Sequence, residues 1–234
     1  MANEETMNET IIPLKGMRGV IASNMMKSLS NSAQLTLHMQ ADISDLEPAR
    51  QKYASDQNSR ITITDILIKA TAEQLKKHPG VNGWINESQI QLVHDIHIGM
   101  AVAIPGGLIV PVLRDAGEKR LLELSGEAKE LAEKAKTGKL KPVECTGSTF
   151  TITNLGAMGV IWFTPIINRP EIGILGVGAA QTVPVFDSDS SGWKPRLMLP
   201  LSLTFNHCAI DGAPAAAFLR DLCISLGQVS PEQL

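Results

Sequence analysis

The 234-residue sequence has few aromatic side chains and no long apolar run. Aromatic residues make up only 4% of the chain, so there is no evident platform on which nucleic-acid bases would stack. The most apolar stretch, residues 98–112, is interrupted by Pro-Gly-Gly at 105–107 and is shorter than the roughly 20 residues that a membrane span needs. The sequence therefore predicts neither a nucleic-acid-binding protein nor a membrane protein.

The chain also lacks an excess of charge and a cysteine framework. It has 21 Lys and Arg residues against 24 Asp and Glu, a net charge of -3, which leaves no basic footprint for nucleic acid or an anionic membrane. Cys145, Cys208 and Cys223 form no Cys-x-x-Cys pair. We therefore expect a reduced, intracellular protein, in the cytoplasm or, in a eukaryote, the mitochondrial matrix.

Domain organisation follows from composition. Residues 1–11 are acidic and polar, unlike a signal or transit peptide, and we expect a disordered lead-in there. The 44% hydrophobic content suits one large domain over residues 12–234. The stretch 187–192 (DSDSSG) is typical of a hairpin loop and not of a domain boundary.

Apolar residues recur at helical spacing in five stretches, which are residues 16–29, 44–53, 64–78, 121–136 and an Ala-rich segment that starts near Pro214. Thr64 is the expected N-cap of the third, because Asp65 would then lie in the positively polarised first turn. The fourth is the most clearly amphipathic, with an i,i+4 pair of Glu130 and Lys134 and with Gly138 as the expected C′ residue.

Strand patterns alternate with these helices. They cover residues 34–43, 96–104, 108–113, 148–153, 171–177 and 197–205, with a turn at 105–107. This mixture predicts an α/β (α+β) two-layer sandwich, in which helices pack on a mixed β-sheet.

The segment 206–212 (NHCAIDG) carries the clearest chemistry. His207 follows an apolar strand and Asp211 precedes a helix, so the imidazole would reach a cleft and could take a proton at neutral pH. The alternative is a structural histidine with Asp211 as an ordinary N-cap, and the segment alone leaves the two readings about equal. Cys208 is a poor nucleophile for His207, because adjacent extended residues point in opposite directions.

Other candidate sites are weaker. The Thr153 hydroxyl ends a strand and could donate to an oxyanion, although threonine also simply favours strands. His94 and His97 would need further ligands to bind a metal, so we expect no metal site. The glycines of 173–178 (GILGVG) match neither a P-loop nor a dinucleotide fingerprint.

Taken together, eight segments stand in the order found in one family. They are MRGVIA (17–22), IGMAVAIPGGLIVPV (98–112), FTITNLG (150–156), FTPIIN (163–168), ILGVG (174–178), PRL (195–197), LSLTFNH (201–207) and DGA (211–213). In these the sequence resembles the acyltransferase component of 2-oxoacid dehydrogenase complexes, over about residues 12–226. Any one segment is weak evidence, but this many in order is highly specific.

The resemblance implies a chloramphenicol-acetyltransferase-like fold and homotrimers, which in most members build larger cores such as a 24-mer or a 60-mer. It implies acyl transfer between dihydrolipoamide and coenzyme A, a substrate, in a channel between subunits. His207 would be the general base and Thr153, from a neighbouring subunit, the oxyanion donor. Asp211 would support the loop with Arg18 as its charge partner, and Asn206 would also support the site.

Two departures qualify the resemblance. The family usually has Asp-His-Arg where this chain has Asn206, His207 and Cys208, and it often has an acidic residue and Thr where this chain has Ala103 and Ile104. We expect acetyl as the acyl group, while branched-chain and succinyl groups stay open. Transfer to a different acceptor and a non-catalytic structural core are the alternatives.

The sequence contains no lipoyl domain and no peripheral-subunit-binding domain. We therefore expect a lipoyl domain to act in cis, if this is a fragment, or in trans. The resemblance also implies decarboxylase and dihydrolipoamide dehydrogenase partners.

Overall fold

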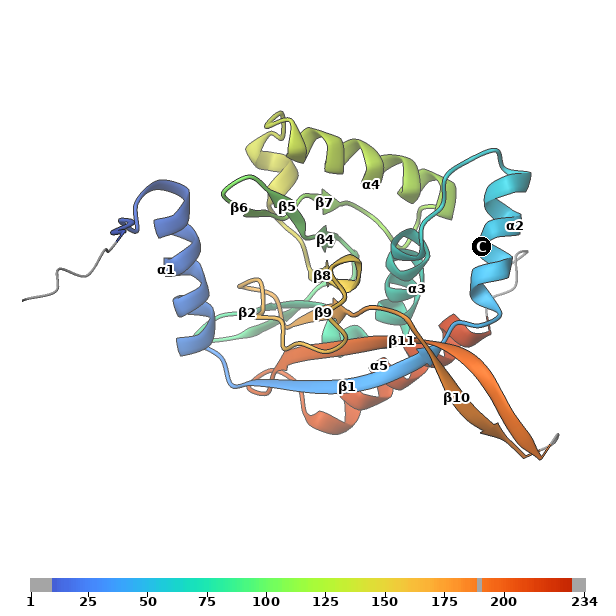
Figure 1. Ribbon diagram of the computed structural model, residues 1–234. Coiled ribbons are helices and arrows are strands. Elements are labelled where there is room, and N and C mark those ends of the chain that lie inside the picture. Colours follow the sequence, from blue (N-terminus) through green and yellow to red (C-terminus); the bar gives the residue numbers. More distant parts are fainter. Residues whose placement is uncertain (1–9, 189–190, 229–234) are drawn as a thin grey trace, which may run out of the picture.

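The computed structural model describes residues 10–188 and 191–228. At its centre lies a seven-stranded sheet (Figure 1). Its strands in spatial order are β1 (Gln34–Asp42), β11 (Gly192–Asn206), β9 (Gly173–Val177), β8 (Phe150–Asn154), β4 (Ile98–Met100) and β7 (Val112–Leu113), and β10 (Gln181–Asp187) pairs with β11. β8 runs parallel to β4 and β9, and the other pairs are antiparallel, which confirms the predicted mixed sheet.

Within the described residues, five α-helices and two small hairpins accompany this sheet. The helices are α1 (Gly16–Ser30), α2 (Leu46–Asp56), α3 (Ile63–Lys77), α4 (Leu121–Lys136) and α5 (Gly212–Gly227). The hairpins pair β2 (Gly83–Ile85) with β3 (Ile90–Leu92) and β5 (Val102–Ile104) with β6 (Gly107–Ile109), and short 3-10 turns span Pro79–Val81, Pro142–Cys145 and Gly156–Met158. None of the helices in the described part is long and apolar enough to cross a membrane.

One face of the sheet packs against helices and forms the hydrophobic core. The Phe150 ring on β8 contacts the Phe218 ring on α5, with centroids 5.8 Å apart. Both rings are fully buried, as are Leu222 and Leu226 further along α5. Phe218, Leu222 and Leu226 recur every four residues, which places them on the side of α5 that faces the sheet.

The opposite face of the sheet carries hydroxyl groups. Thr36 on β1 and Thr204 on β11 lie side by side with their Oγ1 atoms 2.8 Å apart. Two residue pairs further along, on the same face, His38 Nδ1 lies 2.9 Å from Ser202 Oγ. Gly176 continues this row on β9, where an added Cβ would lie 2.8 Å from the Phe163 ring. The irregular segment that contains Phe163 therefore covers this face instead of a helix.

Three helix predictions hold within one or two residues, and two need correction. The N-cap of α3 is Thr62 and not Thr64, because Thr62 and Asp65 form a capping box in which each side chain accepts the other's backbone N–H. The helix expected over 44–53 is α2, displaced to Leu46–Asp56. For α4, the Glu130–Lys134 pair (2.7 Å) and a left-handed Gly138 are both confirmed.

The strand predictions are right in place but often wrong in extent. The strand expected over 96–104 is two short strands, β4 and β5, and that expected over 108–113 is β6 and β7, because β5 and β6 leave the main sheet as a separate hairpin. β9 begins at Gly173 and not at 171, and β8 spans 150–154 and not 148–153.

The strand expected over 197–205 extends back to Gly192, because its first half pairs with β10, which the pattern did not reveal. The hairpin expected at 187–192 is confirmed by the pairing of Asp187 with Gly192, although residues 189–190 lie outside the described residues. Residues 1–9 of the expected lead-in also lie outside them, and residues 10–11 have no regular secondary structure.

Candidate active site

His207 lies in the turn between the end of β11 and the start of α5. Its backbone N–H donates to the Ala33 carbonyl (2.8 Å), and its ring packs beside Phe205 with centroids 5.6 Å apart. The imidazole is 40% exposed. A ring that is held on one side by a strand end and open on the other can receive a proton from an incoming molecule. The catalytic role of His207 stays a prediction.

Asp211 is the carboxylate nearest to this imidazole. Its Oδ1 lies 3.8 Å from His207 Nδ1, and the side chain is 87% exposed. Asp211 occupies the N-cap position of α5, but its side chain makes no capping hydrogen bond. Among the described residues no ion pair joins it to Arg18, so the pairing expected for Arg18 is not formed within one chain and stays a prediction.

Asn206 ties the turn after β11 to the segment that precedes β1. Its side chain is buried, and Oδ1 accepts hydrogen bonds from the backbone N–H groups of Ala33 and Cys208, both at 3.1 Å. An amide oxygen can accept both bonds, as a carboxylate oxygen would, so the turn keeps its anchors without an acidic residue. This geometry fits the supporting role expected for Asn206. Cys208 itself is exposed beside His207.

Thr153 lies near the carboxyl end of β8 on the hydroxyl-lined face of the sheet. It is half-buried and is paired with Gly176, which presents no side chain beside it. The next residue, Asn154, is exposed, and its Nδ2 donates to Thr64 Oγ1 (3.1 Å) on α3. Thr64 therefore anchors the end of β8 and does not cap the helix. Because Thr153 is only half-buried, a molecule could reach its hydroxyl at this end of the sheet.

Strand register places Thr153 and His207 at opposite ends of the sheet. Both strands pair with β9, where Thr153 of β8 lies opposite Gly176 and Phe205 of β11 lies opposite Gly173. Because His207 lies two residues beyond Phe205, the two side chains are about five residues apart along the strands, or roughly 16 Å. They cannot contact the same thioester within one chain.

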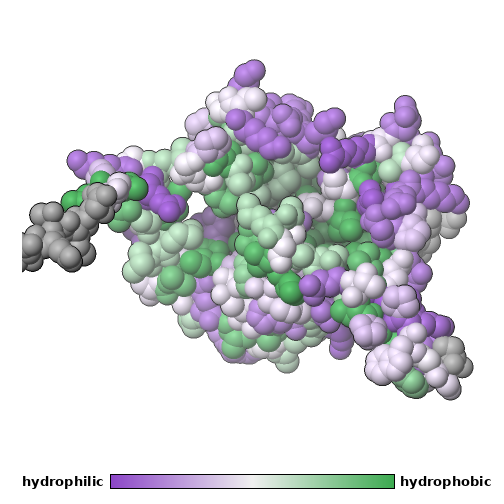
Figure 2. Space-filling view, in the orientation of Figure 1, coloured by the Kyte–Doolittle hydropathy of each residue, from purple (hydrophilic) through white to green (hydrophobic). Residues whose placement is uncertain are grey.

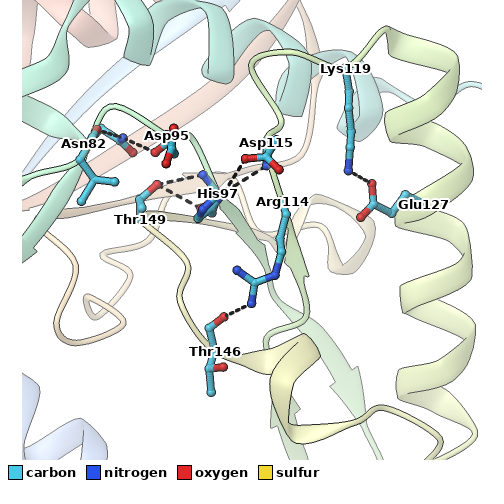
Figure 3. A network of polar contacts seen from close by, with 10 residues as sticks. Asn82, Asp95, His97, Arg114, Asp115, Lys119, Glu127, Thr146 and Thr149 are labelled. Atoms are coloured by element: carbon cyan, nitrogen blue, oxygen red, sulfur yellow. Dashed lines mark hydrogen bonds and ion pairs between the residues drawn. The ribbon is translucent and has the colours of Figure 1, made fainter.

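His97 and His78 make structural contacts. His97 Nδ1 accepts the Asp115 backbone N–H (3.0 Å), and the His97 backbone N–H donates to Thr149 Oγ1 (3.0 Å), as Figure 3 shows. His78 Nε2 lies 3.0 Å from Asp221 Oδ2. In the described part of the chain no three His, Cys, Asp or Glu side chains gather as metal ligands would.

Glu171 is a buried carboxyl group that the sequence analysis did not single out. It is 2% exposed, and burial raises its pKa to about 7, although hydrogen bonds from Ser148, Thr151 and Asn168 act in the opposite direction. The available signal was an ionisable residue at the head of an apolar stretch, 171–178. Such a residue is costly to bury unless it has partners, which makes it a candidate for a functional role.

An apolar surface surrounds α1, which stands at the edge of the molecule (Figure 1). Met17, Val20 and Met26 are exposed on it, and a cavity of about 1020 Å³ separates the helix from residues that include Leu108 and Pro170. Figure 2 shows hydrophobic side chains over α1 and the centre of this face, while hydrophilic ones cover α2 and α4. An exposed apolar helix of this kind indicates a protein–protein contact.

Comparison with known proteins identifies the family. The model of the 2-oxoacid dehydrogenases acyltransferase (catalytic domain) matches residues 6–233. The chain belongs to this family. The dihydrolipoyllysine-residue acetyltransferase component of the acetoin cleaving system of Bacillus subtilis is 46% identical over 213 residues, which are 89% of this chain and 53% of that protein. The chain thus spans about half the length of this curated relative.

Solved structures agree with the family assignment. The dihydrolipoamide acetyltransferase of Azotobacter vinelandii is 39% identical, with a TM-score of 0.89 and 94% of this chain and 92% of that chain covered. That work concerns the roles of a serine, a histidine and, four residues after the histidine, an asparagine in the catalytic mechanism. The cubic core of a pyruvate dehydrogenase multienzyme complex gives the same identity, TM-score and coverage.

A chloramphenicol acetyltransferase has the same fold, with a TM-score of 0.56 at 15% identity over 93% of this chain and 99% of that one. This likeness concerns the fold alone, and it confirms the expected chloramphenicol-acetyltransferase-like sandwich.

Proposed function

We propose that this chain transfers an acyl group, acetyl, between dihydrolipoamide and coenzyme A in a 2-oxoacid dehydrogenase complex of the pyruvate, acetoin or branched-chain type. The observation that carries the proposal is the half-open His207 imidazole, fixed at a strand end with Asp211 four residues later. The Azotobacter vinelandii acetyltransferase studied for its catalytic histidine has an asparagine at the same spacing. The acetyl group follows the relatives that are named acetyltransferases.

The chemistry follows from the two ends of the sheet. His207 Nδ1 faces Asp211, which leaves Nε2 to take the thiol proton of coenzyme A, or of dihydrolipoamide in the reverse direction. The thiolate attacks the thioester carbonyl, and the Thr153 hydroxyl donates a hydrogen bond to the oxyanion that forms. When the intermediate collapses, His207 returns the proton to the departing thiol.

A second copy of the chain completes the site. Because roughly 16 Å separates His207 from Thr153 along the strands of one chain, a base and an oxyanion donor that act on one thioester come from two subunits. We propose a homotrimer with three such sites, which builds a larger core of 24 or 60 chains. The exposed apolar residues of α1 and the similarity to a cubic core support assembly.

The substrates and partners follow the family. Coenzyme A is a substrate, and the lipoamide arrives on a lipoyl domain, in cis or in trans. The decarboxylase and dihydrolipoamide dehydrogenase components are the expected partners, and the cytoplasm is the expected location.

Replacement of His207 tests the proposal. His207→Ala is expected to lower acetyl transfer from acetyl-CoA to dihydrolipoamide by about 10³-fold or more, because the general base is lost. Native mass and circular dichroism should remain those of the wild type. A panel of acyl-CoA substrates measured alongside would identify the acyl group. Near-normal turnover by His207→Ala would overturn the mechanism, and coenzyme A binding without any transfer by the wild type would indicate a structural core.

A further inference from the structure

We propose that Glu171 is a positioning residue for His207. Glu171 acts through Asn206 and one water molecule, which is held between the Glu171 and Asn206 side chains. The inference rests on the proposed acyl transfer and deepens it, because it adds a residue that touches neither substrate nor base. Three observations carry it: the hydrogen bonds of Glu171, the cavity beside it and the bonds of Asn206.

The two carboxyl oxygens of Glu171 have unequal surroundings. Oε1 accepts three hydrogen bonds, from Ser148 Oγ (2.5 Å), Thr151 Oγ1 (2.8 Å) and Asn168 Nδ2 (2.9 Å). Oε2 is buried, and it has no hydrogen-bond partner among the described residues. A buried oxygen without a partner is costly, so a further donor or acceptor is needed on this side of the carboxyl group.

A small cavity adjoins both Glu171 and Asn206. Its volume is about 20 Å³, which suits one water molecule, and its walls also include Ser28 and Ile167. Ser28 Oγ donates to the Ile167 carbonyl (2.6 Å), which closes that wall. A water in this cavity would have a carboxyl oxygen on one side and the Asn206 amide on the other.

Asn206 is free to bind this water through its amino group. Its Oδ1 already accepts the backbone N–H groups of Ala33 and Cys208, which leaves Nδ2 as the donor. These two bonds hold Cys208, which follows His207, and Ala33, whose carbonyl accepts the His207 backbone N–H. A change at Glu171 that alters the water would therefore move the atoms that position the imidazole.

The carboxyl group titrates in the range where the enzyme would work. Burial raises the pKa of Glu171 to about 7. The neutral acid can donate from one oxygen, whereas the carboxylate only accepts, so the two forms orient the water differently. The charged Arg169 lines the small cavity as well as an adjoining one, Cys145 lines the adjoining one, and His207 follows Asn206 in the chain. The elements β8 and α1 present only the hydroxyls of Thr151 and Ser28 to it.

Three variants and a control test the link. Glu171→Gln keeps the shape and the accepting oxygen but removes the titration, and Asn206→Asp places a second carboxyl group across the water. The third variant combines both, and Glu87→Gln, at an exposed loop position, is the matched control. For each, kcat, the KM for coenzyme A and the thermal unfolding midpoint are measured from pH 5.5 to pH 9.

The expected results separate positioning from folding. Glu171→Gln should lower kcat about tenfold, because a displaced base loses rate, while the KM for coenzyme A stays within about twofold. The inflection in log kcat that Glu171 contributes should vanish. Asn206→Asp should move this inflection up by about one pH unit, because a like charge disfavours the carboxylate. In the Glu171→Gln background that movement should be absent, and Glu87→Gln should resemble the wild type.

The outcomes are distinguishable from those of the proposed function. A wild type that transfers acyl groups, with Glu171→Gln unchanged in kcat and pH profile, would overturn the positioning role and leave the function standing. If the wild type transferred no acyl group, the proposed function would be wrong. The thermal unfolding midpoints would then test whether Glu171 and Asn206 are coupled. Additive effects of the two substitutions on the midpoint would overturn this coupling, and non-additive effects would support it.

Discussion

The two ends of the central sheet are built differently. At the His207 end, the strand is tied down by buried polar groups, in which Asn206 holds two backbone N–H groups and Glu171 lies beneath. At the Thr153 end, the strand opens toward the surface, with a hydroxyl beside a glycine and an exposed Asn154. One end is suited to fix a base, and the other is suited to offer a donor to an incoming group.

The proposed mechanism uses this difference, because it takes one group from each end of the sheet and therefore from two subunits. A general base must be held firmly and stay accessible, while an oxyanion donor needs a position about 3 Å from the carbonyl oxygen. Each end of the sheet satisfies one requirement. The account therefore predicts that damage at the two ends has different effects.

After His207→Ala, the largest effect on activity is expected from Thr153→Ala. Loss of one oxyanion donor should lower kcat by about 10²- to 10³-fold with little change in KM, because the bond forms only in the transition state. Thr153→Ser keeps the hydroxyl and is the matched control, expected within a few fold of the wild type. Equal losses in both variants would show that the methyl group of Thr153, and not its hydroxyl, matters.

Glu171, at the His207 end, is expected to make stability depend on pH. The pKa of Glu171 is raised from 4.5 to about 7 in the folded chain, so the unfolded chain releases this proton first. Stability is therefore expected to fall between about pH 4.5 and pH 7, by up to about 3 kcal/mol, and to level off above that range. Urea unfolding at fixed protein concentration measures it. Glu171→Gln should flatten this fall, and an unchanged slope would contradict the assignment.

The smallest effect is expected from Asp211→Asn. The Asp211 carboxylate is largely exposed and lies 3.8 Å from His207, so its interaction is screened by solvent and is worth at most about 1 kcal/mol. Turnover should fall by less than about fivefold, and the difference should shrink at high salt. A loss as large as that of Thr153→Ala would mean that assembly buries Asp211, as a pairing with Arg18 of another subunit would do.

The sequence predicted the elements whose signals are local. The α4 bounds followed from its apolar stripe and its flanking Gly138, and the end of β11 followed from alternation. The start of α3 was wrong by two residues, because Thr62 and Thr64 are both plausible caps and only the reciprocal bonds with Asp65 decide between them. β10 was missed because Pro184 and polar residues obscure its pattern.

Long-range arrangement could not be predicted in this way. The placing of β8 between β4 and β9 joins segments far apart in the sequence, and it sets the distance between Thr153 and His207. The residue types of segment 206–212 made His207 a candidate general base, and the motifs in family order favoured that role over a structural one. The role of Glu171 depends on three donors from separate segments, Ser148, Thr151 and Asn168, which no local pattern brings together.

Complementation between inactive chains tests the central claim most directly. His207→Ala and Thr153→Ala chains, carrying different tags, are co-expressed in equal amounts and the mixed oligomers are purified by both tags. If each site takes His207 from one subunit and Thr153 from its neighbour, mixing restores about a third of the wild-type activity in isolated mixed trimers, where one junction in three has both residues. In a large core of randomly mixed trimers it restores about a quarter, because one junction in four has both. Activity no higher than that of the separate variants would contradict a site shared between subunits.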